Sequence, residues 1–243
     1  MSLVSAHTLR GLFTTLPPRH TLVRLMYSIG VRSVPVVLAT GGFVGMVLAV
    51  EMGQQLHKMN AETTAGPIIN IAMLKELGPV LAGVMLAGRI GGAMAAELGT
   101  MKVTEQIDAL RAIGADPIYY LVVPRFLSCI FLIPILTIFA DFVGVLGGYG
   151  VMVWALGVDA HGYWELSRQI VENWDIFCGI LKSFVFGAFI AIICCYKGFA
   201  AGEGAEGVGR ATTEAFVFSF VAILVLDFFL VVLLRFIYGM FIV

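Results

Sequence analysis

The sequence has little charge. Asp, Glu, Lys and Arg make up 13% of its 243 residues, whereas soluble domains average about 25%. Apolar residues make up 60%, more than a soluble domain of this size could bury, so the composition predicts an integral membrane protein. The 15 Lys and Arg residues are matched by 16 Asp and Glu residues. This absence of a basic excess argues against nucleic acid as a partner.

The sequence also lacks the residue patterns of an enzyme or a metal site. It contains no Gly-Lys dipeptide and therefore no Walker A loop for binding ATP. Its four cysteines lie in apolar runs without metal-ligand spacing to a histidine, and we interpret them as small buried apolar residues. The four histidines lie outside the predicted spans, and no Ser/His or HExxH pattern is present. We therefore expect no catalytic residue, no metal and no bound cofactor in this chain.

Five apolar segments are long enough to cross a bilayer as helices, which takes about 20 residues. They are residues 34–56, 67–97, 118–156, 176–197 and 214–243. The third segment is too long for one upright span and too short for two, so we predict one long helix, tilted or kinked near Pro134. The expected fold class is an all-α integral membrane protein, with residues 1–243 forming a single transmembrane domain.

The orientation follows from the Lys and Arg residues in the short loops, which favour the cytoplasmic side. Residues 1–33, 98–117 and 198–213 carry most of them, which predicts a cytoplasmic N-terminus and an external C-terminus. Residues 19–32 show apolar positions at helical spacing and predict an amphipathic helix in the cytoplasmic interface. A cytoplasmic extension of the first span is the alternative, although Gly30 favours a break. With the amphipathic helix in the interface, residues 1–33 form a cytoplasmic or interfacial segment, and residues 34–243 form a five-span bundle.

Several ionisable residues lie inside the predicted spans, where each costs at least about 2.5 kcal/mol. They are Glu51, Lys75, Glu76, Lys182 and Asp227. Counting about 1.5 Å per residue along each span places them all in the outer half of the membrane. We predict that they share a polar cavity open to the outside, because two cations and three acids largely neutralise each other. Purely structural ion pairs are the alternative, and Asp141 joins this group only if the long third helix enters at the right depth.

The loop between the second and third spans predicts a short amphipathic helix at residues 104–114. Thr104 suits the N-cap with Glu105 in the first turn, and Gly114 ends the helix. Its narrow apolar stripe consists of Ile107, Leu110 and Ile113. We expect this stripe to rest on the membrane or on a partner protein.

A set of sequence runs, in a fixed order, resembles the MlaE/YrbE permease family. The principal runs are 74–83 (LKELGPVLAG), 87–91 (AGRIG), 95–101 (AAELGTM), 104–110 (TEQIDAL), 209–213 (GRATT) and 226–228 (LDF). The resemblance covers nearly the whole chain from about Arg24 onward. Glu51 departs from it, because a glutamine corresponds to this position in a member of the family.

The resemblance implies the permease subunit of a lipid ABC transporter of the Mla or MCE type. It implies a homodimer in a bacterial inner membrane that moves phospholipid between the inner and outer membranes. A separate P-loop ATPase would hydrolyse ATP with Mg²⁺, and a periplasmic MCE-domain protein would bind outside. Lys75, Glu76, Lys182 and Asp227 match charged positions tied to transport in the family. The loop helix would be the coupling helix, and its residues at the ATPase would be Thr104, Glu105, Gln106, Ile107, Asp108, Leu110 and Arg111.

Other functions remain as alternatives. An ion-gradient-driven secondary transporter could use the same intramembrane charges, although five spans without a visible repeat are unusual for that class. An intramembrane enzyme lacks its nucleophile and base here. A purely structural anchor would give the buried charges no role. Dependence on an ATPase subunit rather than on an ion gradient would separate the ABC transporter permease from the secondary transporter.

Overall fold

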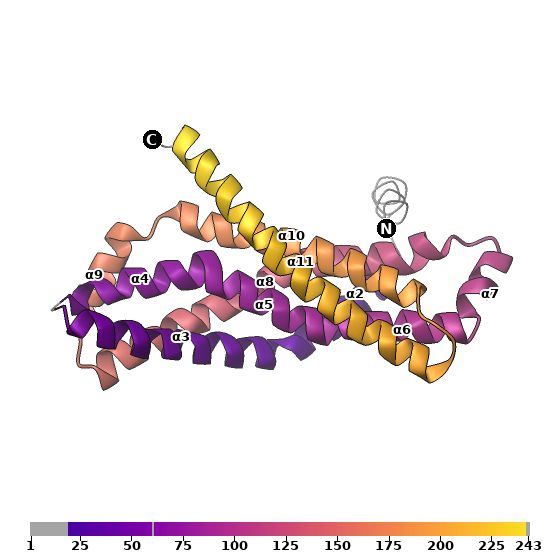
Figure 1. The fold of residues 1–243 in the computed structure, drawn as a ribbon, viewed down its shortest axis with the longest axis horizontal. Coiled ribbons are helices and arrows are strands. Elements are labelled where there is room, and N and C mark those ends of the chain that lie inside the picture. The colour runs from indigo at the N-terminus through magenta and orange to yellow at the C-terminus, as the bar shows by residue number, and fades with distance from the viewer. Residues whose placement is uncertain (1–18, 60, 242–243) are drawn as a thin grey trace. The chain divides into compact units, whose positions relative to one another are not determined.

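A computed structural model describes residues 19–59 and 61–241 of the chain (Figure 1). Within this part every regular element is a helix and none is a strand. Five helical stretches are long and apolar enough to cross a membrane. They are Leu25–His57, Ala65–Val103, Ile118–Ala155, Asn173–Phe199 and Gly204–Met240. The prediction of an all-α membrane protein with about five spans is therefore confirmed.

The second and third spans are each assembled from several helical elements. The described elements are α2 (Arg19–Ile29), η1 (Val31–Ser33), α3 (Val34–His57), η2 (Glu62–Thr64), α4 (Ala65–Ala72), η3 (Met73–Leu77), α5 (Gly78–Leu86), η4 (Ala87–Gly91), α6 (Gly92–Val103), α7 (Gln106–Ala112), η5 (Ile118–Val122), α8 (Val123–Gly150), η6 (Val151–Ala155), α9 (Ala160–Ile170), α10 (Asn173–Phe199) and α11 (Gly204–Phe241). The elements η3, η4, η5 and η6 are π-helical turns. Such turns are frequent at functional sites. Two of them lie in the second span and contain three of its charged residues, Lys75, Glu76 and Arg89.

The third span is one unbroken helical stretch from η5 through α8 to η6, as predicted. Pro134 lies inside α8, where it has no backbone N–H to donate. The chain also divides into two compact units at this residue. A kink at Pro134 stays a prediction.

The N-terminal helix is separate from the first span. Gly30 ends α2 and the 3-10 turn η1 follows before α3 begins. Ile29 is buried, and Leu25 and Met26 are half-buried, so much of the apolar face of α2 is covered by the protein itself. The break expected at Gly30 is present, whereas the position of α2 at the membrane surface stays a prediction.

The two compact units are each built from segments that are distant in sequence. Unit 1 comprises Gly83–Ile133, Phe184–Val243 and Met1–Ser33, as far as these residues are described. Unit 2 comprises Val34–Ala82 and Pro134–Ser183. Each long span from the second to the fourth therefore contributes one part to each unit.

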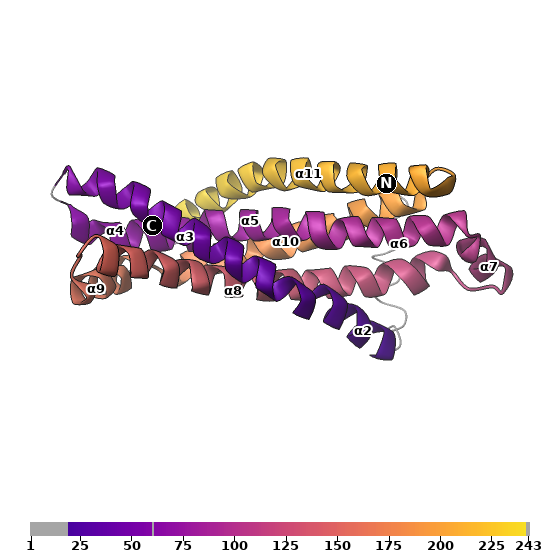
Figure 2. The ribbon, with the colours of Figure 1, turned by 90° about the horizontal axis from the view of Figure 1, so that it is seen from below.

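Unit 2 is packed through glycines that bring helix backbones into contact. A Cβ atom on Gly45 would lie 1.9 Å from the carbonyl oxygen of Gly144, and one on Gly41 would lie 2.4 Å from that of Ala140. These glycines mark where α3 crosses α8 (Figure 2). Close backbone approach of this kind is the main source of helix association in lipid, where no hydrophobic drive exists between helices.

At one end of unit 2, α9 packs against α4 (Figure 1). The Tyr163 hydroxyl donates to Asn70 Oδ1 at 3.3 Å, and Asn70 Nδ2 donates to Ser167 Oγ at 3.0 Å. Burial raises the pKa of Tyr163 to about 12, so the phenol stays protonated and remains a donor at neutral pH. Asp159 caps the start of α9 by accepting the N–H of Gly162.

In unit 1, α11 packs along α6 (Figure 2). Lys197 Nζ of α10 contacts Glu214 Oε2 of α11 at 2.9 Å and ties these two helices. Many large apolar side chains of α11 remain exposed, including Phe218, Phe228, Phe229 and Phe236. Such a surface suits contact with lipid or with another apolar protein surface.

Candidate functional site

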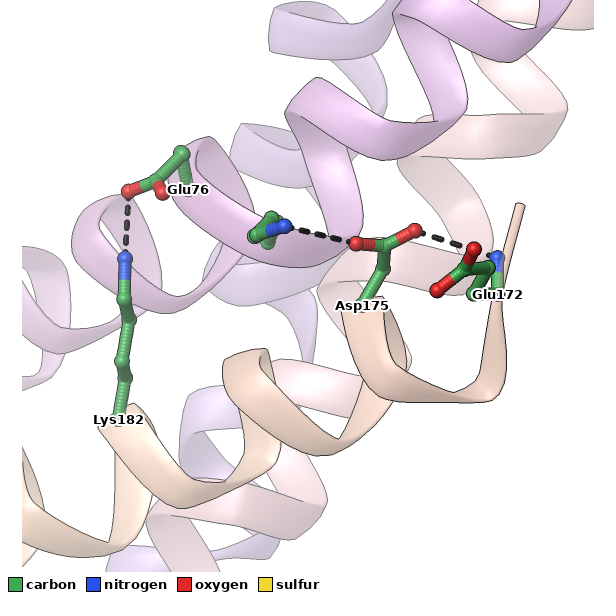
Figure 3. A network of polar contacts seen from close by, with 5 residues as sticks. Glu76, Glu172, Asp175 and Lys182 are labelled. Atoms are coloured by element: carbon green, nitrogen blue, oxygen red, sulfur yellow. Dashed lines mark hydrogen bonds and ion pairs between the residues drawn. The ribbon is translucent and has the colours of Figure 1, made fainter. Parts of the chain in front are cut away.

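Four charged residues of unit 2 form two ion pairs between η3 and α10. Lys75 Nζ lies 2.9 Å from Asp175 Oδ1, and Lys182 Nζ lies 2.5 Å from Glu76 Oε2. Figure 3 shows Lys182 reaching from α10 to Glu76, while Asp175 lies nearer the start of α10. We call Lys75, Glu76, Asp175 and Lys182 the charge quartet. Its two cations and two anions balance, so the set carries no net charge.

The geometry of the charge quartet follows from helix periodicity. Asp175 and Lys182 are seven residues apart, close to two turns of α10, and therefore lie on one face of it. Lys75 and Glu76 are adjacent within the π-helical turn η3. Each helix thus offers one acid and one base, and each base on one helix meets the acid on the other.

Burial differs between the two helices of the charge quartet. Lys182 is 1% exposed and the Asp175 side chain is 9% exposed, whereas the side chains of Lys75 and Glu76 are 36% and 38% exposed. Each pair therefore joins a buried residue of α10 to a half-exposed residue of η3. A charge as buried as Lys182 needs its counter-charge, because an unpaired buried cation is strongly destabilising. The half-exposed members remain accessible to a ligand.

Asp175 has a second contact that fixes it at the start of α10. Its Oδ2 accepts the backbone N–H of Glu172 at 3.2 Å (Figure 3). Because Asp175 lies at the third position of α10, this contact is one half of a capping box. The acid also interacts favourably with the positive end of the helix dipole. Asp175 is therefore held in place even before Lys75 reaches it.

A glycine allows the helices of the charge quartet to touch. Gly179 lies between Asp175 and Lys182 on α10, and a Cβ atom there would lie 2.0 Å from the carbonyl oxygen of Leu74. The backbones of α10 and η3 are thus in direct contact. This contact brings both ion pairs within range at the same time.

A further acid, Asp141 of α8, is buried beside the second span, which also carries Lys75 and Glu76. It is 6% exposed, and its Oδ1 has no hydrogen-bond partner among the described residues. It lies against the backbone of Gly78, directly after η3, because a Cβ atom there would lie 1.5 Å from this oxygen. Asp141 and the quartet therefore meet the same short stretch of the second span.

The structure brings together three of the five predicted intramembrane charges. Lys75, Glu76 and Lys182 are in the charge quartet, while Glu51 on α3 is exposed and has no ion pair or hydrogen bond within the described part of the chain. Asp227 is half-buried on α11, which belongs to unit 1. A cavity shared by all five stays a prediction. Asp175 is the member that the sequence analysis missed, since it lies just before the predicted start of the fourth span; its seven-residue spacing to Lys182 was the available signal.

The predicted coupling helix exists as α7, but its N-cap was wrongly predicted. Thr104 continues α6, where its hydroxyl donates to the Thr100 carbonyl oxygen at 2.8 Å. A threonine hydroxyl that returns to the preceding turn in this way no longer caps the next helix. The N-cap is Glu105, whose φ of 59° places it in the left-handed region, without a side-chain cap. Gln106 is the first residue of α7, so the helix is shorter than the predicted 104–114.

The apolar stripe of α7 is covered mainly by the chain itself. Ile107 is buried and Leu110 is half-buried, in a cluster with Leu98, Leu121 and Val122. Only the last member of the stripe, Ile113, is largely exposed, at 78%. The expectation that a membrane or a partner covers the stripe is therefore wrong for its first two positions. What α7 presents outward is its polar face, including Glu105, Gln106, Asp108 and Arg111.

The segments that carry α7 are fastened to one another by polar contacts. Arg125 Nη2 of α8 donates to Glu97 Oε2 of α6 at 2.7 Å, and Arg125 Nη1 donates to the Leu121 carbonyl oxygen. Lys102 Nζ, near the end of α6, donates to the carbonyl oxygen of Ala201 at 2.8 Å. The ends of spans two and three, between which α7 lies, are therefore held to each other and to the connection between spans four and five.

Several known proteins are similar to this chain in sequence. Residues 22–233 match the family model described as Permease MlaE. A probable ABC transporter permease protein of Rickettsia conorii is 44% identical over 207 residues, covering 85% of this chain and 80% of that protein. The chloroplastic protein TRIGALACTOSYLDIACYLGLYCEROL 1 of Arabidopsis thaliana is 38% identical, over 87% of this chain and 60% of its own length. The intermembrane phospholipid transport system permease protein MlaE of Haemophilus influenzae is 35% identical, over 86% and 80% of the two chains.

Proposed function

The chain belongs to the MlaE permease family, and we propose that it is the membrane-spanning subunit of an ABC transporter that moves phospholipid or a related lipid between the inner and outer membranes of a bacterium. The observation that carries the lipid assignment is the charge quartet. It is a balanced set of ion pairs on two spans, with buried members on α10 and half-exposed members on η3. The Haemophilus relative, named as a phospholipid permease, supports the same substrate class.

The charge quartet offers both charges that a phospholipid headgroup needs. A phosphate can pair with the ammonium group of Lys75, and a cationic headgroup amine can pair with the carboxylate of Glu76. When a phosphate takes Lys75 from Asp175, the Asp175 carboxylate still accepts the backbone N–H of Glu172. We propose that the quartet, with Glu51 and Asp227, borders a lipid cavity open to the outside of the inner membrane.

ATP hydrolysis is assigned to another chain. This sequence has no Gly-Lys dipeptide and therefore no Walker A loop, so we propose that a separate P-loop ATPase binds ATP and Mg²⁺. The polar face of α7 is the surface proposed for that ATPase. Because Ile107 and Leu110 are packed on spans two and three, a force applied to α7 is transmitted directly to those spans.

The assembly around the chain is also a proposal. We propose a homodimer, an N-terminus on the cytoplasmic side and a periplasmic MCE-domain partner. The distribution of Lys and Arg in the loops supports this orientation. The exposed aromatic surface of α11 supports contact with lipid or with another membrane helix.

The test of the proposed function is purification of the tagged chain from its native membranes, followed by reconstitution of the complex. We expect a P-loop ATPase to accompany the chain, and transfer of a fluorescent phospholipid between vesicles to require ATP. Transfer that follows an imposed ion gradient and ignores ATP would instead favour the secondary-transporter alternative. The variant Lys182→Ala should lower lipid transfer while the complex still assembles, and Arg168→Ala, which removes an exposed cation of α9 in the same unit, is the control for loss of one positive charge.

A further inference from the structure

Unit 1 contains a polar pocket that none of the charge-quartet residues lines. It has a volume of about 190 Å³ and is bordered by α2 and η1 on one side and by η4 and α6 on the other. Its polar lining consists of Ser28, Arg32, Ser33, Arg89 and Glu97. The remaining lining is apolar. Glu97 also pairs with Arg125 of α8, whereas the proposed transport function gives no role to Arg32 or Arg89.

The pocket has an excess of positive charge. Glu97 is the one acid in its lining, and its carboxylate is already bound by Arg125 from α8 at 2.7 Å. Arg32 and Arg89 are both exposed, and neither has an ion pair or a side-chain hydrogen bond among the described residues. Two guanidinium groups therefore border one pocket without a counter-charge. Arginine inside a membrane protein is costly and usually has a partner, which indicates that the partner is a ligand.

The two arginines lie on two different segments of unit 1. Ser28 is near the end of α2, and Arg32 lies in the 3-10 turn η1 that follows Gly30; both line the pocket. On the second span, Arg89 lies in the π-helical turn η4 and Glu97 lies two turns later in α6. With the predicted orientation, these segments occupy the cytoplasmic half of the membrane.

We propose that this pocket binds a phosphate group, supplied by the headgroup of an anionic phospholipid of the cytoplasmic leaflet. Guanidinium groups match phosphate oxygens with paired hydrogen bonds, and basic pockets between membrane helices bind lipid headgroups. The volume is below the range of about 300–1,000 Å³ that encloses a drug-sized ligand, so it accommodates a headgroup while the acyl chains stay outside. The apolar lining, including Leu25 and Ile90, suits the first acyl carbons. This lipid is held and not carried, so the inference goes beyond the proposed transport function.

The test measures lipid binding by the full chain, without the ATPase and without transport. The chain is reconstituted in nanodiscs of phosphatidylcholine with or without phosphatidylglycerol, and the lipid retained after extraction into detergent is counted by native mass spectrometry. We expect preferential retention of phosphatidylglycerol. Arg32→Gln and Arg89→Gln should each weaken it by about tenfold, and the double variant should remove the preference.

The controls separate this site from general charge effects. Arg168→Gln removes another exposed arginine, on α9 in unit 2, and should leave retention unchanged. Arg89→Lys keeps the charge but loses the paired hydrogen bonds, and should give an intermediate loss. Undiminished phosphatidylglycerol retention in the double variant, with normal size-exclusion behaviour, would overturn the proposal, as would an equal loss in Arg168→Gln.

A second arm distinguishes the lipid from soluble phosphate. A ligand that binds only the folded state raises the melting temperature, and the rise grows with the logarithm of the ligand concentration once this exceeds Kd. We expect phosphatidylglycerol in mixed micelles to raise it in the wild-type chain and not in the double variant, and inorganic phosphate to leave it unchanged. An arginine-dependent rise with inorganic phosphate alone would overturn the lipid assignment and assign the pocket to a soluble anion. Because ATP and lipid transfer are absent from both assays, failure here is separate from failure of the transport function.

Discussion

Two buried cations join helices in this protein, and they are held in different ways. Lys182, in unit 2, meets the half-exposed Glu76 of a π-helical turn and belongs to a set of four balanced charges. Arg125, in unit 1, meets Glu97 of a regular helix and also donates to the Leu121 carbonyl oxygen of its own helix. The planar guanidinium can divide its donors between a carboxylate and the backbone, which a lysine ammonium does less well. We infer that Arg125 holds α6 and α8 in a fixed arrangement, whereas the residues of the charge quartet can exchange partners.

The largest effect is expected from placing two like charges in the charge quartet. Glu76→Lys would set an ammonium group against buried Lys182, and we expect a loss of several kcal/mol, near the about 3–5 kcal/mol typical of broken buried pairs. Thermal unfolding in detergent measures it. The double variant Glu76→Lys with Lys182→Glu restores one cation and one anion and should recover most of the stability.

The same double variant sharpens the distinction between a structural pair and a lipid site. If the pair only holds the helices together, lipid transfer should return with the stability. We expect transfer to stay low, because the headgroup would meet the charges in reversed positions. Full recovery of transfer in the swapped protein would place Glu76 and Lys182 in a structural role alone.

The next effect concerns the glycine beneath the charge quartet. Gly179→Ala would force α10 away from Leu74, and overpacking of this kind costs about 1–3 kcal/mol. Gly209→Ala is the matched control, because it is also helical and a Cβ atom there meets nothing within 4 Å. We expect a lower melting temperature for Gly179→Ala only. Equal behaviour of the two variants would contradict the close contact of α10 with η3.

A smaller loss of stability is expected from the Glu97–Arg125 ion pair, which joins the spans that carry α7. Glu97→Gln removes the negative charge opposite Arg125, whose side chain is 5% exposed. The glutamine amide oxygen can still accept from the guanidinium, and Arg125 keeps its bond to Leu121, so we expect a stability loss of about 1–2 kcal/mol. We also expect the rate of lipid-stimulated ATP hydrolysis by the assembled complex to fall at temperatures where the variant is still folded. An unchanged rate of lipid-stimulated ATP hydrolysis would show that the Glu97–Arg125 pair has no part in transmitting force from α7.

The smallest effect is expected at the start of α7. Glu105 adopts a φ of 59°, which glycine accepts without steric cost. Glu105→Gly should therefore leave stability unchanged or raise it by up to about 1 kcal/mol, whereas Glu105→Arg should weaken ATPase association. A clear destabilisation by Glu105→Gly, measured by thermal unfolding, would show that the carboxylate itself supports α7.

The spans were predictable because their signal is long and local. Runs of about 20 apolar residues have no other stable arrangement in a single chain, and all five predicted spans overlap those observed. The long third helix was also accessible from length alone. Pairing inside the membrane was less accessible. Asp175 is close in space to Lys75 but 100 residues away in sequence, and one sequence without an alignment carries no record of such contacts.

The N-cap of α7 and the π-helical turns could not be predicted from the sequence for a different reason. Thr104 fits the usual composition of an N-cap, but its hydroxyl is equally able to bond to the preceding turn, and the path of the chain decides between the two. The π-helical turns left no separable pattern either, because an extra residue in one turn changes the apolar periodicity of a span only slightly. Tertiary packing decides both features.

The π-helical turn η3 has a consequence for how related chains are aligned. Met73–Leu77 accommodates one residue beyond what an α-helical turn requires. A relative with a single deletion here would close this turn into a regular α-helical turn and keep the side chains of both flanking helices in place, so that only the residues inside the turn shift. Lys75 and Glu76 would then no longer both face α10. We therefore expect a gap of one position within this pentapeptide in relatives that arrange these intramembrane charges differently.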